Sequence, residues 1–151
     1  MRIYAVIDAN VLLSAMISHN RDAATTRVVR AVLAGKVVPL YNYEIMAEYD
    51  EVLHRRRFNL DEEDVRRMLS EFVRLGVRSN RVPVADVVRD PKDVVFYEVA
   101  LSKEDTYLVT GNIKDFPATP IVVTPAEMIG ILVELGVLDG MEGGGAAEEQ
   151  G

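Results

Sequence analysis

The stretch IYAVID at residues 3–8 indicates the fold class of this chain. Its five apolar residues run without the alternation of polar and apolar side chains that a half-exposed strand shows, and the run ends at Asp8. Such a run is typical of a strand buried on both faces, as in a parallel sheet. Similar short runs follow at residues 37–41, 106–110 and 121–124.

Helical patterns alternate with these runs. Apolar spacing, together with capping residues such as Asp90 and Thr124, predicts helices at 22–33, 43–57, from the acidic turn 61–64 to about 75, 94–103 and 125–135. Alternating strands and helices form βαβ units. We therefore expect a three-layer α/β/α sandwich with a central parallel sheet.

Two segments are less regular. Pro39 removes a backbone N–H from the run at 37–41, so that strand is expected to be irregular or near a sheet edge. Residues 82–88 are ambiguous, with a possible strand near Val77. We expect one domain over residues 1–138, followed by a disordered Gly- and Glu-rich tail at 139–151.

Composition narrows the classes of protein. The chain has 151 residues, no cysteine and two histidines, which excludes disulfides and thiolate metal sites and disfavours a multi-histidine metal site. No apolar run is long enough to cross a membrane, and the first residues do not resemble a signal peptide, so we expect a soluble, cytoplasmic protein. The net charge of −7 disfavours a nucleic-acid partner. However, residues 139–151 carry four acids and no base, whereas residues 54–81 carry eight arginines and five acids.

Four acidic residues occupy positions at or near the carboxyl ends of the expected strands, where ligands of open α/β sheets bind. They are Asp8, Glu48, Asp93 and Asp115. Clustered carboxylates repel one another unless a hard cation such as Mg²⁺ or Mn²⁺ compensates them. Such ions activate water and stabilise phosphoryl displacement, so the pattern favours metal-dependent phosphodiester hydrolysis. Each acid also has a structural interpretation, because Asp8 and Asp93 can serve a helix start and Glu48 can be a solvated helix residue.

The motifs around these acids resemble those of PIN domains. The resemblance lies in DANVLLSA at 8–15, the helix segment 44–58, DPKD at 90–93, LVTGN with Asp-Phe over 108–116, and IVVTPAE at 121–127. The motifs occur in the family's order over roughly residues 1–135. They are most similar to those of the prokaryotic PIN group of VapC-like toxins from toxin–antitoxin pairs.

The resemblance implies an Mg²⁺- or Mn²⁺-dependent ribonuclease that is often dimeric and often bound by an antitoxin protein. It implies that Asp8, Glu48 and Asp93 are acidic metal ligands. Many relatives have T-G-D where this chain has Thr110-Gly111-Asn112, and others have T-x-N-x-x-D-F, which fits Asn112 and Asp115 here. Asp115 is therefore the favoured fourth acid, with Asn112 orienting water or the metal. Asn10 and Thr110 are expected to hold the acids in place, although both can equally form local turn hydrogen bonds.

RNA binding requires cations and favours exposed aromatic rings. Arg55, Arg56 and Arg57 are the candidate phosphate-binding residues, although they also suit the carboxyl end of a helix. Candidate rings for base stacking are Tyr41, Tyr43, Phe58 and Tyr97, which can instead pack in the core or at a dimer interface.

Two alternatives remain open. One is a metal-dependent phosphohydrolase that acts on another substrate, and the other is a weak or inactive PIN scaffold that serves as a binding module. Asn112 keeps the second alternative open.

Overall fold

The apolar run at residues 3–7 contributes the central strand of a parallel sheet. In the computed structural model, which describes residues 2–85, 88 and 90–140, β1 (Tyr4–Ile7) lies between β2 (Val38–Tyr41) and β4 (Thr106–Val109). The short strands β3 (Val77–Arg78) and β5 (Val122–Val123) flank them, giving the order β3-β2-β1-β4-β5 with every pair parallel. Ala5, Val6 and Ile7 are fully buried.

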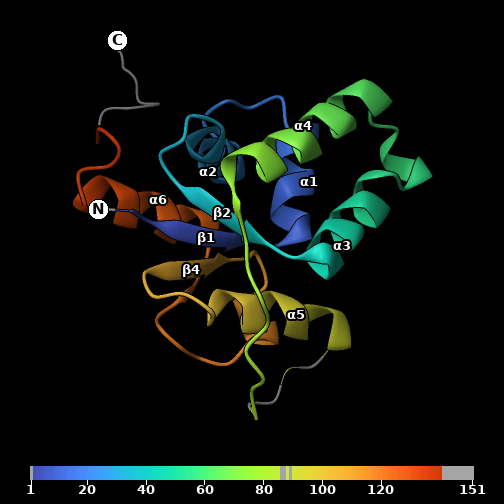
Figure 1. The fold of residues 1–151 in the computed structure, drawn as a ribbon. Helices are drawn as coiled ribbons and strands as arrows, with labels where there is room; N and C mark the ends of the chain where they lie inside the picture. The colour runs from blue at the N-terminus through green and yellow to red at the C-terminus, as the bar shows by residue number, and fades with distance from the viewer. Residues whose placement is uncertain (1, 86–87, 89, 141–151) are drawn as a thin grey trace.

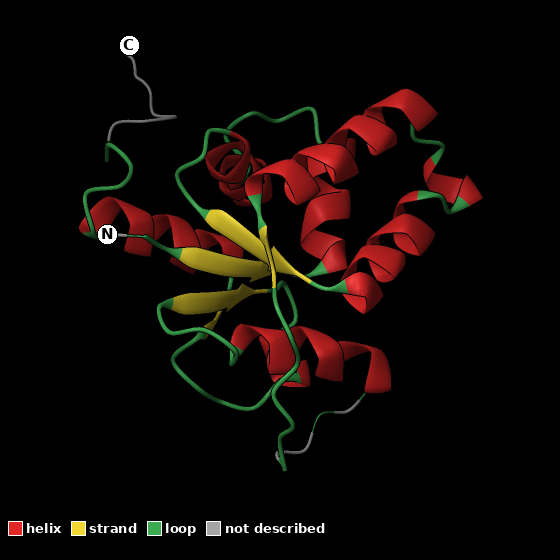
Figure 2. Ribbon diagram, in the orientation of Figure 1, coloured by secondary structure: helices red, strands yellow, loops and turns green. Residues whose placement is uncertain are grey.

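Helices cover both faces of this sheet (Figures 1 and 2). On one face lie α1 (Ala9–Ile17), α2 (Ala24–Leu33) and α4 (Glu62–Leu75), and α5 (Pro91–Ala100) covers the other. The helix α3 (Tyr43–Leu53) packs against α1, α4 and α5, and α6 (Pro125–Glu134) packs against α2 and β4. The expected three-layer α/β/α sandwich with a parallel sheet is confirmed.

Side-chain caps start several helices where the sequence predicts them. Asp61 accepts a hydrogen bond from the N–H of Asp64 at 3.1 Å, and Asp90 accepts one from the N–H of Lys92 at 2.9 Å. Thr124 and Glu127 form both hydrogen bonds of a capping box at the start of α6. These bonds satisfy N–H groups that have no partner within the first turn of a helix.

Two helices differ from expectation. Helix α1 is absent from the predicted elements because its sequence is nearly all apolar and shows no polar face; Val11 and Leu12 are buried. Helix α3 ends at Leu53 rather than near residue 57, and a 3₁₀ turn, η1 (Arg56–Phe58), follows. The ring of His54 lies 2.7 Å from the carbonyl oxygen of Asp50 and 2.6 Å from a Glu62 carboxylate oxygen, which joins the end of α3 to the start of α4.

Pro39 lies in β2, next to the edge strand β3, so it is near a sheet edge as the sequence predicts. It pairs with Ala5 of β1, whereas β3 pairs only with Leu40 and Tyr41. At Pro39, β2 therefore has a paired strand on one side only, which makes the missing N–H tolerable.

The last described residues of the chain pack against the end of α6. Leu138 is buried and its N–H donates to the carbonyl of Leu132. Two predicted features lie partly outside the described residues. For the predicted tail these are residues 141–151, and for the ambiguous segment they are residues 86 and 87, with residue 89 just after it. Among the helices of the described ranges, none has the length and apolar character needed to cross a bilayer.

Gly76 allows α4 to return to β3 beside β2, and this gives a first prediction. A Cβ atom added at Gly76 would lie 2.4 Å from the carbonyl oxygen of Pro39 and 2.6 Å from that of Phe72. Because both neighbours are backbone atoms, Gly76→Ala is expected to lower the free energy of unfolding by about 2–3 kcal/mol. Gly130→Ala is the matched control: its Cβ meets open space within α6, so that variant should be about 0.5–1 kcal/mol more stable than the parent. Equal unfolding midpoints of the two variants in urea would contradict the predicted steric conflict.

Candidate functional site

Asp8 lies where β1 ends and α1 begins, and it is only 7% exposed. Its backbone N–H donates to the carbonyl of Val109, which continues the pairing of β1 with β4. Oδ2 accepts a 2.7 Å hydrogen bond from Thr110 Oγ1, and Oδ1 accepts one from the Asn10 N–H at 3.3 Å. Burial raises the pKa of Asp8, the hydrogen bonds oppose the rise, and the charge of Asp115 adds to it.

Thr110 holds Asp8 from the neighbouring strand. Thr110 is fully buried, and its hydroxyl oxygen also accepts a hydrogen bond from the N–H of Asn112 at 3.0 Å. The structure thus places the side chain of Thr110 against Asp8, and its supporting role in a functional site stays a prediction. Asn10 contacts Asp8 through its backbone N–H, whereas the residue itself is exposed.

Asp93 shows the strongest electrostatic effect at this edge. It is half-buried in the first turn of α5, behind the N-cap Asp90. The pKa of Asp93 is raised to about 6, first by burial and then by repulsion from the charges of Asp8, Asp90, Asp115 and Glu48, in that order. Four acids from different elements therefore act on one carboxyl group. The three other acids that the sequence assigns to the site are all among them.

Glu48 and Asp115 come from separate elements, far apart in the sequence. Glu48 is half-buried in the middle of α3 and lines a groove between the first turns of α3 and α5, two helices that begin side by side at the carboxyl edge of the sheet (Figure 1). Asp115 is half-buried in the 3₁₀ turn η2 (Ile113–Asp115), and its charge raises the pKa of both Asp8 and Asp93. Asn112 is exposed and reaches this edge through its backbone N–H to Thr110.

The four carboxylates form a charge cluster rather than a finished coordination shell. Among residues 2–85, 88 and 90–140, no three acidic or histidine side chains are close enough together to hold an ion. Their chemistry nevertheless suits a hard divalent cation, because all four donors are carboxylate oxygens and their negative charges repel one another at Asp93. Glu48 and Asp115 are both partly exposed.

The arginines of residues 54–81 are less available than their number suggests. Arg55 forms two hydrogen bonds to Glu51, at 2.9 and 3.1 Å, and Arg57 lies over the ring of Phe58. Arg56 is exposed. On α4, acids three or four positions earlier in the helix pair with the arginines, and these pairs are Arg66 with Glu62 and Glu63, Arg67 with Asp64, and Arg74 with Glu71. Much of the local positive excess is therefore matched on the helix surface.

Tyr49 supports the end of β1 just before Asp8, although no motif of the sequence marks it as a site residue. It is fully buried against Phe72 and Phe96, with ring centroids 5.8 and 6.2 Å away. Its hydroxyl donates a 2.6 Å hydrogen bond to the carbonyl of Ile7, the residue before Asp8. Burial raises the pKa of Tyr49, and the charge of Asp8 adds to the rise. Its helical spacing alone does not reveal that its hydroxyl reaches the end of β1.

A second unforeseen feature connects α3 to α5. Glu98 of α5 is 8% exposed, and its Oε1 lies 2.6 Å from Arg81 Nε. Arg81 Nη1 also contacts both carboxylate oxygens of Glu44, at 2.9 and 3.0 Å. The second oxygen of Glu98 accepts the N–H of Val84. We call these three charged residues the Arg81 bridge. Arg81 is one of the eight arginines of residues 54–81. Its guanidinium group joins α3 to α5.

Burial of Asp93, together with the repulsion from nearby acids, predicts a gain of stability when its charge is removed. A carboxyl group whose folded pKa is near 6 and whose unfolded pKa is near 3.8 binds more protons in the folded state between those values. Its charged form therefore lowers the stability of the metal-free protein, increasingly as pH rises from about 4 to 6. In EDTA at pH 7, Asp93→Asn is expected to be more stable by about 1 kcal/mol, a figure reduced for solvent screening.

The check is thermal unfolding of both proteins as a function of pH. The difference between them should shrink as pH falls through 6 toward 4. A difference that is constant with pH would contradict the assigned repulsion.

Comparison with known proteins agrees with this arrangement. A family model with the description PIN domain matches residues 4–114, a range that includes Asp8, Glu48 and Asp93 and ends one residue before Asp115. Neither the curated proteins nor the solved structures gave a match. The match covers more than half of the chain and includes β1 through β4, so the chain belongs to the PIN domain family.

Proposed function

We propose that this chain is a divalent-metal-dependent ribonuclease that hydrolyses RNA phosphodiester bonds at the carboxylate cluster. The observation that carries the proposal is the raised pKa of Asp93, caused by burial and by the charges of Asp8, Asp115 and Glu48, among others. Membership of a family whose members are generally metal-dependent nucleases supports the reaction class. Strongly perturbed carboxyl groups at the carboxyl edge of a parallel sheet are typical of functional sites.

The chain's own residues prepare Asp8 to act as a charged ligand. Thr110 and the Asn10 N–H each hold one oxygen of Asp8, and each oxygen keeps a further lone pair for another partner. Tyr49 fixes the preceding carbonyl, so both the backbone and the side chain of Asp8 are oriented. Thr110 and Tyr49 are positioning residues because they act through Asp8.

Asp8, Glu48, Asp93 and Asp115 are the residues that would hold Mg²⁺ or Mn²⁺ in this proposal. When bound, such an ion supplies water activation and charge stabilisation for an in-line displacement at phosphorus. Glu48 faces the groove between α3 and α5, from which substrate and water reach the cluster. Asp93 lies in the first turn of α5, the other helix of this groove, and the charge of Glu48 acts on it.

The finer assignments rest on the resemblance. A toxin role with an antitoxin protein as partner, a homodimer and a cytoplasmic location are consistent with a VapC-like PIN protein, and we propose them on that basis. The single nuclease domain at residues 1–138 with a tail at 139–151 belongs to the same proposal.

A weak or inactive PIN scaffold is the second candidate. It is favoured by the finding that no three acids of the described residues stand close enough together to enclose an ion. Calorimetric titration with Mn²⁺ separates the two: an active site binds the ion in a way that depends on Asp8 and Asp93, whereas a scaffold shows no such binding.

Loss of single charges tests the reaction. With Mn²⁺ and single-stranded RNA, Asp8→Asn and Asp93→Asn are expected to lower the cleavage rate about 100-fold or more, because each removes a carboxylate that would hold the ion beside the reacting phosphate. Asp90→Asn is the matched control, since asparagine caps a helix as well as aspartate does, and Asp90 is outside the proposed ligand set. Cleavage that survives EDTA, or equal rates in all three variants, would overturn the proposal.

A separate pair of variants decides the fourth ligand. Asp115 acts electrostatically on both Asp8 and Asp93, whereas Asn112 reaches Thr110 through its backbone. Asp115→Asn is therefore expected to weaken Mn²⁺ binding about tenfold or more, and Asn112→Ala to leave it within about twofold. The reverse ranking in calorimetry would assign the position to Asn112.

A further inference from the structure

The groove between α3 and α5 has a volume of about 340 Å³. Its lining includes Tyr43 and Glu48 from α3 and Pro91, Lys92 and Val95 from α5. This volume lies at the lower end of the range for small-ligand pockets, so it suits one nucleotide rather than a duplex. Glu48 belongs to both the groove and the carboxylate cluster, so a molecule bound in the groove would lie next to that cluster.

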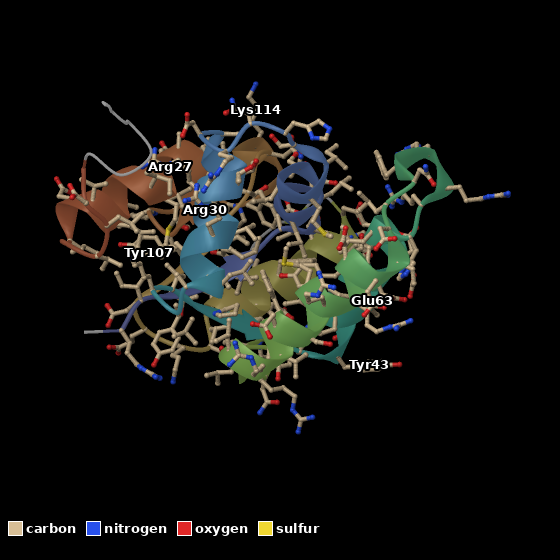
Figure 3. All side chains as sticks on the ribbon, turned by 90° about the horizontal axis from the view of Figure 1, so that it is seen from above. Arg27, Arg30, Tyr43, Glu63, Tyr107 and Lys114 are labelled. Atoms are coloured by element: carbon tan, nitrogen blue, oxygen red, sulfur yellow. The ribbon has the colours of Figure 1, made fainter. Side chains whose placement is uncertain are left out.

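Tyr43 is exposed to an extent that the fold does not require. It is the first residue of α3, directly after the N-cap Asn42, and it is 85% exposed. Figure 3 shows its side chain projecting outward from α3. The described part of the chain offers its ring and hydroxyl no hydrogen bond, ion pair or ring contact. Of the other rings considered from sequence, Tyr97 is buried, and Tyr41 and Phe58 are half-buried.

The charges around the groove suit a phosphate on its α5 side. Lys92 is exposed, and its charge contributes, after Arg55, to the lowered pKa of Glu51 on α3. Glu44, which also lines the groove, is paired with Arg81 through two contacts. The Arg81 bridge therefore offsets one of the two acids of the groove, and Lys92 places a mobile positive charge at its rim.

We propose that this groove holds one unpaired nucleotide of the RNA substrate, with its base stacked on Tyr43 and its phosphate bound by Lys92. The proposal rests on the ribonuclease function above and adds a binding site to it. Stacking needs a flat exposed ring and a base free of its pairing partner, and Tyr43 supplies the first. Pro91 and Val95 give the groove an apolar surface for the base, and Glu48 joins it to the cluster.

The test measures binding separately from cleavage. A short single-stranded RNA with one 2-aminopurine, whose fluorescence falls on stacking, is titrated in Mn²⁺ into Asp93→Asn protein, in which the proposed function predicts cleavage too slow to interfere with the titration. Adding Tyr43→Ala is expected to weaken binding about tenfold and to abolish the quenching, whereas Tyr43→Phe should keep both. In the otherwise unchanged enzyme, Tyr43→Ala should raise KM by a similar factor with little change in kcat.

The role of Lys92 is tested by the salt dependence of RNA binding, with a separate control variant. Lys92→Ala is expected to lower the slope of log affinity against log salt by about 0.7, the contribution of one phosphate contact on a single strand, without changing the quenching. Lys103→Ala is the matched control, because Lys103 lies over the ring of Tyr4, the first residue of β1, at the opposite edge of the sheet. Its slope should equal that of the parent. A duplex of the same RNA should bind more weakly than the single strand.

The outcomes separate this proposal from the proposed function. If the enzyme cleaves RNA but Tyr43→Ala binds and quenches like its parent, the groove proposal is overturned and the ribonuclease stands. Absence of quenching in the parent, or equal binding of duplex and single strand, overturns it as well. If quenching depends on Tyr43 but no cleavage occurs with any divalent ion, the binding site stands and the hydrolytic function fails.

Discussion

The register between β1 and β4 is the constraint on which the candidate site depends. Ile7 pairs with Val109, so the next residues, Asp8 and Thr110, leave the sheet side by side although 102 positions separate them. Side chains alternate between the two faces of a sheet, so a shift of one residue would turn Thr110 away from Asp8. The register is held by fully buried apolar side chains, among them Leu108. Packing in the core thus determines the chemistry at the edge.

The acids at that edge lower the stability of the folded protein. Burial and like charges raise the pKa of Asp93, and burial raises that of Asp8. The ion pairs on α4 offer little in return, because exposed pairs are screened by solvent. Local rules of stability are commonly broken at functional sites, where a ligand resolves the conflict. If these acids served only as helix caps, they would not need to lie near one another.

The sequence predicts the layers and the acids well because each depends on local signals. Apolar runs predict four of the five strands, with only a possible strand noted near Val77, and the caps at Asp90 and Thr124 place two helix starts. Helix α1 escapes because an apolar helix buried on most sides has no periodicity to detect. The contacts of Tyr49 and of the Arg81 bridge escape for another reason: their partners are set by packing between distant segments, which no spacing rule describes.

The Arg81 bridge has a consequence for the energetics of recognition. It joins the first turn of α3 to α5 through a carboxylate that is almost buried, so separating the two helices would leave Glu98 without its charged partner. Breaking such a contact costs several kcal/mol as an order of magnitude, so the two walls of the groove move as one body. A surface that is rigid before its ligand arrives loses little conformational entropy on binding. Affinity there would be governed by how well the incoming shape fits.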